Sequence, residues 1–138
     1  MITTTTNRSG SWVYVTEYGD ALLIAPTKQT LADLQSLVGG YVECVAQTED
    51  QMGFACDVWV NEEGLFRNDF GFNLVASFMT GRQLVGPAVI CTTDAQGNTR
   101  GLSEANITRL LDDGLMIDDN HGDLWTPSSA AAFRFPVA

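Results

Sequence analysis

The sequence has few of the residues that catalysis and metal binding most often use. Among its 138 residues are one histidine and three cysteines. A single subunit therefore cannot build a two-histidine metal site, and the cysteines lie too far apart to form a zinc-ligand pair. The sequence also lacks a glycine-rich dinucleotide loop, a phosphate loop ending in Gly-Lys-Ser/Thr and a Gly-x-Ser-x-Gly nucleophile elbow. We accordingly identify no catalytic residues, no metal site and no cofactor.

Positive charge is also scarce. Seven lysines and arginines stand against seventeen aspartates and glutamates, which gives a formal net charge of −10. Such a surface repels a phosphate backbone unless the few arginines gather on one face, so we expect no direct binding of nucleic acid. The carboxylates are scattered along the chain, which favours a role in solubility. The alternative is that the acidic surface imitates a nucleic acid toward a basic partner.

Long apolar runs are missing. No segment approaches the roughly 20 apolar residues of a membrane helix, and the N-terminal residues lack the apolar region of a signal peptide. Cys44, Cys56 and Cys91 each lie in or beside an apolar stretch, which is typical of buried thiols in a reducing compartment. We therefore expect a soluble cytoplasmic protein that has no membrane partner.

The apolar residues that are present follow the spacing of β-strands in several short segments. Residues 12–17 and 21–25 are rich in β-forming side chains and predict a hairpin. Residues 41–46 and 55–60 are expected to pair with each other, and the alternation along 55–60 indicates a strand with one exposed face. The other predicted strands are residues 88–92, 115–117 and 124–126, of which the last two form a hairpin.

Helical periodicity is clearest over residues 31–38, where apolar side chains recur on one face. Thr30 is a candidate cap for this helix, Asp33 completes a weak capping box, and Gly39 stops the helix. Two further helices are predicted, one starting after Asn73 and the other after Ser103.

Together these elements predict a single α+β domain over residues 11–127. It contains an antiparallel or mixed β-sheet, two main helices and one short helix. The apolar share of 45% is enough for such a domain to bury its own core. Residues 1–10, which are mostly Thr, Ser, Asn and Gly, are expected to form a disordered tail. Residues 128–138 form a C-terminal tail of uncertain order.

Polar side chains are concentrated after the strand at 55–60 and around the short helix that follows. Loops held by a rigid scaffold are where binding residues tend to lie, and aromatic residues in this stretch are candidates for the floor of a pocket. The alternative is an ordinary turn with surface ion pairs. The candidate ligand-binding residues are Asn61, Glu62, Arg67 and Arg82, over an aromatic floor of Phe66, Phe70 and Phe72.

Two other polar groups are weaker candidates. Glu62 and Glu63 are adjacent, so on a strand they point to opposite faces and do not jointly flank one bond as a hydrolytic pair would. Residues 118–123 contain three aspartates, an asparagine and the single histidine. Their spacing does not match the calcium-binding loop, and a polar hairpin tip is the preferred interpretation.

Four motifs occur in the same order in a known family. They are LQSLVGGYVE at 34–43, VNEEG at 60–64, LVGPAVI at 84–90 and GLSEANI at 101–107. Over about residues 22–111 the chain resembles the small domain-of-unknown-function family numbered 3846, whose members lie largely in phage, plasmid and bacterial genomes. The chain departs from the family pattern at residues 68–73. The resemblance implies a setting in a mobile element and supplies no reaction.

These observations lead to two functional hypotheses. The first is a small acidic accessory protein, derived from a phage or mobile element, that binds a host or phage protein and is not an enzyme. Its location would then be the cytoplasm of the host cell, and its oligomeric state is left open. The alternative is a protein that binds a small molecule or nucleotide through the polar loop after the VNEEG strand.

Overall fold

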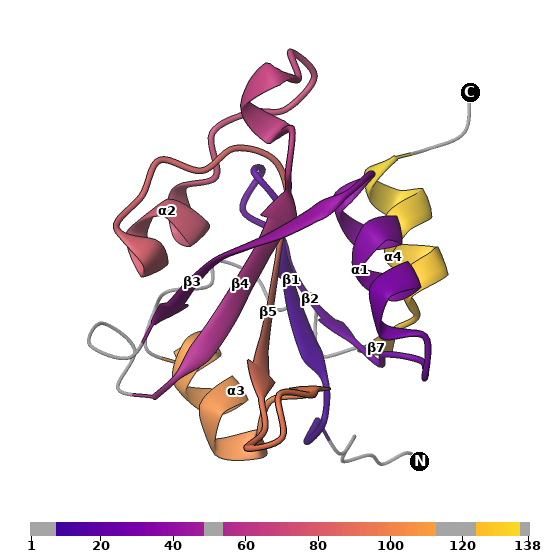
Figure 1. Cartoon of the computed structure of the whole chain (residues 1–138), viewed down its shortest axis with the longest axis vertical. Coiled ribbons are helices and arrows are strands. Elements are labelled where there is room, and N and C mark those ends of the chain that lie inside the picture. The colour runs from indigo at the N-terminus through magenta and orange to yellow at the C-terminus, as the bar shows by residue number, and fades with distance from the viewer. Residues whose placement is uncertain (1–7, 49–53, 113–123, 136–138) are drawn as a thin grey trace.

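The protein is a single α+β domain in which helices cover both faces of one mixed sheet (Figure 1). This computed structural model describes residues 8–48, 54–112 and 124–135. Within those residues the sheet has seven strands, accompanied by four helices and one short 3-10 turn. The predicted fold class is confirmed. The predicted number of helices, two main ones and a short one, is smaller than the four that the described residues form.

The sheet is antiparallel except at one edge. Its strand order is β3-β4-β5-β1-β2-β7, and β6 pairs with β5 beside this path. The predicted hairpin of β1 and β2 and the predicted pairing of β3 with β4 are both confirmed. At the far edge β7 runs parallel to β2, and residues 115–117 of the predicted last hairpin lie outside the described residues. The strands are β1 Trp12–Val15, β2 Ala21–Ile24, β3 Val42–Thr48, β4 Cys56–Asn61, β5 Ala88–Thr93, β6 Thr99–Arg100 and β7 Leu124–Trp125.

Two helices lie on each face of the sheet. Helices α1 and α4 cover one face, and α2 and α3 cover the other, as the right and left sides of Figure 1 show. Each helix buries apolar side chains against the strands, which produces a separate hydrophobic core on each side. The helices are α1 Thr30–Val38, α2 Leu74–Thr80, α3 Glu104–Asp112 and α4 Pro127–Arg134, and the 3-10 turn η1 is Gly64–Phe66.

Strand β4 is buried on both faces, which corrects the prediction that one face is exposed. Val58 and Val60 belong to the core under α2 and α3, whereas Trp59 packs into the core under α1. Asp57, on the same face as Trp59, is only 3% exposed and accepts a hydrogen bond from the Thr93 hydroxyl. The alternation along the strand was read correctly, but α1 covers the face that was expected to meet solvent.

The three cysteines differ in their surroundings, since Cys56 lies in the core under α2 and α3 and Cys91 lies in the core under α1 and α4. Cys56 and Cys91 are buried, as the sequence predicts, whereas Cys44 on β3 is exposed. Burial raises the pKa of the Cys91 thiol, and the nearby Asp57 carboxylate acts in the same direction. Cys91 is therefore held as a neutral thiol, which is a weak nucleophile.

The start of α1 differs from the predicted capping box. The cap position is Gln29, which makes no side-chain capping bond, and Thr30 is the first helical residue. Asp33 instead turns back toward the preceding loop, where its carboxylate accepts hydrogen bonds from the Thr27 amide at 2.7 Å and the Thr27 hydroxyl at 2.8 Å. The acidic residue thus anchors the β2–α1 loop to the helix.

This difference has a measurable result. Asp33→Ala should lower the free energy of unfolding by about 1–2 kcal/mol, because it leaves the Thr27 amide and hydroxyl without their acceptor. Thr30→Ala should change it by less than about 0.5 kcal/mol, since Thr30 makes no cap. Urea denaturation of both variants checks the assignment, and equal losses would restore the capping box predicted from the sequence.

Candidate functional site

The end of β4 is where the predicted site residues begin. Asn61 is 5% exposed, and both ends of its amide are used inside the protein. Its Nδ2 donates to the Val38 carbonyl at 3.1 Å, and its Oδ1 accepts from the Glu63 amide at 2.8 Å. A Cβ on Gly40 would lie 2.8 Å from Asn61 Nδ2, so glycine at that position lets the side chain reach α1. Asn61 therefore joins the end of α1 to the turn after β4.

Arg67 carries its own counter-ion. Its Nε and Nη2 donate to the two carboxylate oxygens of Asp69 at 2.8 and 2.7 Å. This hydrogen bonding holds the pKa of the Asp69 carboxyl below its ordinary value. The guanidinium also lies 4.3 Å above the centre of the Phe70 ring. Its Nη1 also donates to the Gly39 carbonyl at 3.4 Å, so Arg67 is already paired with its own loop and with the end of α1.

Arg82 is attached to the outer strand of the sheet. It follows Gly81 at the end of α2, and its Nη1 donates to the Val45 carbonyl at 2.7 Å. The register of β3 against β4 shifts between Cys44 and Ala46, so Val45 is the extra residue of a β-bulge. Arg82 thus holds the segment after α2 against β3.

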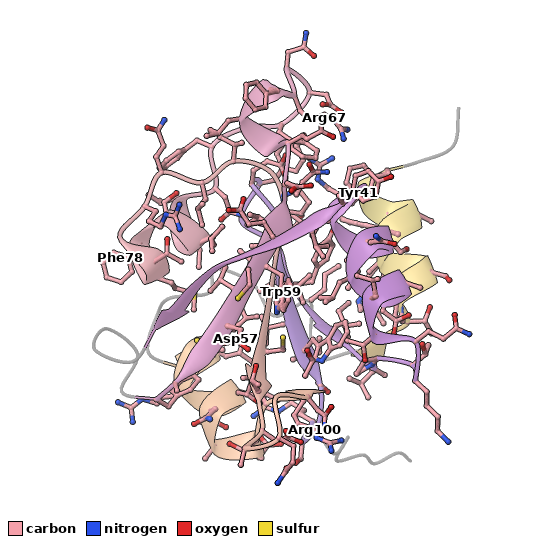
Figure 2. All side chains as sticks on the ribbon, in the orientation of Figure 1. Tyr41, Asp57, Trp59, Arg67, Phe78 and Arg100 are labelled. Carbon is pink, nitrogen blue, oxygen red and sulfur yellow. The ribbon has the colours of Figure 1, made fainter. Side chains whose placement is uncertain are left out.

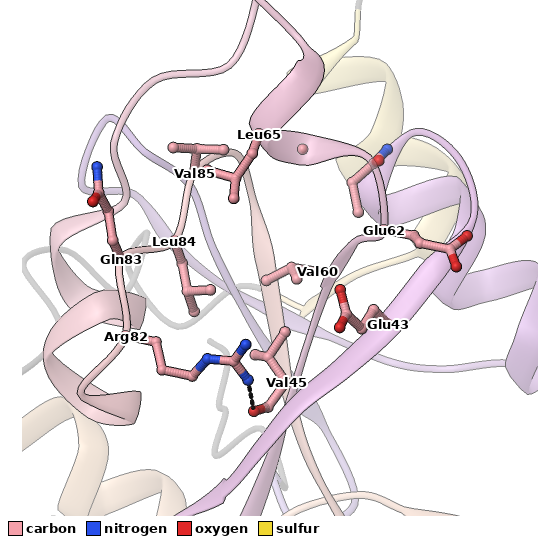
Figure 3. A pocket seen from close by; sticks show the side chains of 11 residues that line it. Glu43, Val45, Val60, Glu62, Leu65, Arg82, Gln83, Leu84 and Val85 are labelled. Atoms are coloured by element: carbon pink, nitrogen blue, oxygen red, sulfur yellow. Dashed lines mark hydrogen bonds between the residues drawn. The ribbon is translucent and has the colours of Figure 1, made fainter.

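The structure divides the predicted residues between two hollows. The β3 hollow, with a volume of about 90 Å³, lies between β3, η1 and residues 82–85, and Asn61, Glu62 and Arg82 line it (Figure 3). The second hollow is open, has a volume of about 280 Å³ and is lined by Asn61 and Arg67 together with the Gly39-Gly40 joint. The four side chains therefore do not converge on one pocket.

The predicted aromatic floor does not form under either hollow, because none of its three phenylalanines lines them. Phe66 and Phe72 are 89% and 50% exposed. Phe70 is buried elsewhere, in the space that Gly86 leaves open, where a Cβ would lie 2.5 Å from its ring. Phe70 is a packing residue of the loop and does not face a ligand.

Sequence reasoning missed a buried ion pair. The Arg134 Nε donates to Glu17 Oε1 at 2.9 Å, and Nη2 pairs with Oε2. The two side chains are 8% and 1% exposed. The guanidinium also lies within 6 Å of the rings of Tyr18, Phe70 and Phe135. This pair fastens the end of α4 to the β1–β2 hairpin.

Sequence reasoning also missed an exposed apolar surface on the connection from β4 to β5. Leu74 and Phe78 lie one turn apart on α2, at 66% and 56% exposed, while Val75, Ala76 and Met79 face the core. Figure 2 shows Phe78 on the outer side of this helix. The signal was an apolar stripe wider than one buried helix face requires. We call the following side chains the apolar surface: Leu65, Phe66, Phe72, Leu74 and Phe78.

The model of a family named for its domain of unknown function, DUF3846, matches residues 10–114. The chain belongs to the DUF3846 family. This membership confirms the resemblance seen in the motifs, and the matched range contains the β3 hollow and the apolar surface. Helix α4 lies outside the matched range. No curated protein matches the chain.

A likeness to a solved structure extends over most of this DUF3846 member. The crystal structure of the small RNA methyltransferase HEN1 matches 78% of the chain at 14% identity, with a TM-score of 0.52. The match spans 16% of the HEN1 chain. At this identity the likeness shows a shared fold and nothing about activity.

The described residues contain neither a membrane-spanning helix nor a metal-binding cluster. Within residues 8–48, 54–112 and 124–135 no helix is long and apolar enough to cross a membrane. The same residues contain no group of three or more His, Cys, Asp or Glu side chains placed to hold a metal ion. The polar loop at 118–123 lies outside the described residues.

Proposed function

We propose that this protein is a protein-binding module that acts without catalysis, and that the apolar surface contacts its partner. The supporting observation is that five large apolar side chains between β4 and β5 are each at least 50% exposed. They are half of the ten large apolar side chains that are exposed in the described residues, and apolar side chains that form one exposed patch mark an interaction site more often than single exposed ones do. Phenylalanine is also enriched in the cores of protein interfaces.

The chemistry of the partner follows from charge. The chain carries a formal charge of −10, so electrostatic complementarity favours a partner whose contacting surface is basic around an apolar centre. The family resemblance suggests the setting: the partner is a protein of the host cell or of the mobile element itself. Imitation of nucleic acid is a special case of the same proposal.

The contacts of the polar residues favour this function over binding of a small molecule or nucleotide. Asn61, Arg67 and Arg82 each bond to groups of the chain itself. The β3 hollow, at about 90 Å³, is far smaller than the roughly 300–1,000 Å³ of typical ligand sites. The second hollow approaches that range in volume but is open to solvent.

A pair of matched variants tests the proposal. Leu74→Ser with Phe78→Ser should reduce capture of the partner from host lysate by about thirtyfold. The reason is that a few central side chains carry most of the binding free energy of an interface. The control is Leu31→Ser with Leu124→Ser, which removes two exposed leucines from α1 and β7. Neither double variant should change the thermal midpoint of unfolding by more than a few degrees.

The result of interest is a difference between the two double variants. A protein that the wild-type chain and the control capture, but that the Leu74 and Phe78 variant does not, supports the proposal. If the two double variants capture it equally well, the apolar surface is not the contact. Absence of any captured protein, with the chain folded and in excess, also contradicts the proposal.

A further inference from the structure

Helix α4 ends in an arginine followed by a phenylalanine, and both side chains lie in a site that distant parts of the chain build. We infer that this site is a receptor for an arginine–aromatic pair, that Arg134 and Phe135 occupy it as a releasable internal ligand, and that a partner protein carrying the same pair replaces them. The inference goes beyond the proposed function, because it concerns a second contact site. We call the following residues the receptor: Glu17, Tyr18, Gly39 and Phe70.

The receptor holds the arginine by charge and by aromatic rings. The Arg134 Nε donates to Glu17 Oε1 at 2.9 Å, and Nη2 pairs with the other carboxylate oxygen. The guanidinium carbon lies 5.3 Å from the centre of the Tyr18 ring and 5.5 Å from that of the Phe70 ring. A planar guanidinium binds both oxygens of a carboxylate and lies against rings at the same time, whereas an ammonium is a compact point charge. The receptor therefore prefers arginine to lysine.

The receptor holds the phenylalanine by shape. Gly39 ends α1 with a left-handed φ of 78°, and a Cβ at that position would lie 2.7 Å from the Phe135 ring. The missing side chain of Gly39 thus leaves a notch that the ring fills. The Phe135 ring also packs on the Phe70 ring, with their centroids 6.2 Å apart. An aromatic side chain is therefore the one that this notch accepts.

The receptor is held in place by contacts that do not involve α4. The Gly71 amide donates to the Glu17 carboxylate at 3.3 Å. The Phe70 ring lies in the space that Gly86 leaves open, and Gly39 is fixed as the residue that ends α1. The site therefore keeps its shape when the internal ligand leaves. The receptor also lies within the range that the family model matches, and the internal ligand lies outside it.

Little apolar burial attaches α4 to the rest of the domain. Figure 1 shows α4 beside α1 on the same face of the sheet. The buried residues of α1 include Leu34, Leu37 and Val38, whereas those of α4 are Pro127 and Ala130. Buried apolar area is the main source of the free energy that docks a helix. The internal ligand therefore decides whether α4 stays docked.

The buried ion pair selects an arginine and adds little to the free energy of docking. Two charges that leave water together lose their hydration, and this loss offsets much of their attraction. When the internal ligand leaves, both charges regain water, unlike in a substitution that strands one of them. Docking of α4 is thus reversible, and a competing arginine–aromatic pair can take the receptor.

Hydrogen exchange of the full wild-type chain tests whether the internal ligand is releasable. The hydrogen-bonded amides of α4 should exchange at least about a hundredfold faster than those of α1, because α4 opens locally while α1 stays docked. The two helices lie on the same face of the sheet, so α1 is the matched reference. Equal protection would show that α4 leaves only when the whole domain unfolds, and would overturn the inference.

Binding of a capped tripeptide tests the chemistry of the receptor. The probe is Phe-Arg-Phe, the sequence of residues 133–135, and its control carries the neutral analogue citrulline in place of arginine. In the double variant Arg134→Ala with Phe135→Ala, nuclear magnetic resonance should show saturable shifts at the amides of Glu17 and Gly39. The citrulline probe should bind at least about tenfold more weakly, because it lacks the charge.

The wild-type chain and two further variants interpret this binding. Wild type should bind the probe at least about tenfold more weakly than the double variant does, because its own pair must first leave. Adding Glu17→Gln to the double variant should weaken the probe about tenfold. Adding Glu104→Gln, on α3 at the other face of the sheet, should leave binding within about twofold, because distant surface charges are screened.

The same measurements also show what would contradict the receptor. Three results would overturn the inference: no saturable shifts, equal binding of the citrulline probe, and equal binding by wild type and the double variant, which would place the probe elsewhere. If the double variant does not fold, Arg134→Gln takes its place, since glutamine still donates to the Glu17 carboxylate. The Leu74 and Phe78 variant leaves the receptor intact, so this inference and the proposed function fail separately.

Discussion

Replacing Arg134 with methionine should lower the free energy of unfolding by about 3–5 kcal/mol, because it leaves the Glu17 carboxylate buried without a counter-ion. The Glu17 side chain is 1% exposed and receives two hydrogen bonds from the guanidinium. The Gly71 amide also donates to this carboxylate, at 3.3 Å. Water cannot replace the lost partner without opening the contact between α4 and the β1–β2 hairpin.

Urea denaturation measures this loss, and two further variants interpret it. Arg100→Met breaks the ion pair between Arg100 and Asp94, in which the arginine side chain is 62% exposed. This change should lower the free energy of unfolding by less than about 1 kcal/mol. Glu17→Gln combined with Arg134→Met removes both charges and should recover part of the loss, since an uncharged pair needs no counter-ion. A cost for Arg134→Met as small as that for Arg100→Met would show that the pair is solvated in solution.

Replacing Asn73 with alanine should destabilise the protein by about 3–4 kcal/mol, because three internal hydrogen bonds end on this one amide. Asn73 is fully buried. Its Oδ1 caps α2 by accepting from the Ala76 amide at 3.0 Å. Its Nδ2 donates to the Val15 carbonyl at 3.1 Å and the Gly86 carbonyl at 2.8 Å. Alanine removes one hydrogen bond from each of these carbonyls.

The conservative variant Asn73→Ser separates the two roles of this side chain. Serine keeps an oxygen that can cap α2 but lacks the second donor, so its cost should fall between zero and that of alanine. Asn68→Ala, an exposed position in the same connection, should change the free energy of unfolding by less than about 0.5 kcal/mol. Equal effects of Asn68→Ala and Asn73→Ala would contradict the assignment of Asn73 as a joint between α2, β1 and the loop before β5.

Most elements could be predicted because their signals are local. The hairpin of β1 and β2 is marked by β-forming residues around Gly19, and α2 is marked by Asn73 before it and Gly81 after it. In contrast, α4 begins with Pro-Ser-Ser, which reads as a loop until Thr126 and Ser129 are seen to cap each other. Its anchor is Glu17, 117 positions away in the sequence, and no local pattern encodes that pairing.

The region of the candidate site could be predicted from the sequence, but the directions in which its side chains point could not. Polar residues after a strand and after a helix indicated the region around Glu62 and Arg82, which do share the β3 hollow. The direction of Asn61 toward the Val38 carbonyl depends on where α1 ends over the sheet. The sequence also could not show that Leu74 and Phe78 face outward while their neighbours face the core, because all of them fit an apolar helix.

The bulge at Val45 also bears on how the chain behaves at high concentration. β3 is an outer strand of the sheet, and such a strand is a template on which another chain can extend the sheet and start aggregation. The extra residue interrupts the regular spacing of backbone groups, and Arg82 occupies the Val45 carbonyl with a positive charge. An incoming strand meets this break partway along the edge, so the fold resists sheet-to-sheet polymerisation while the neighbouring surface stays available to a partner.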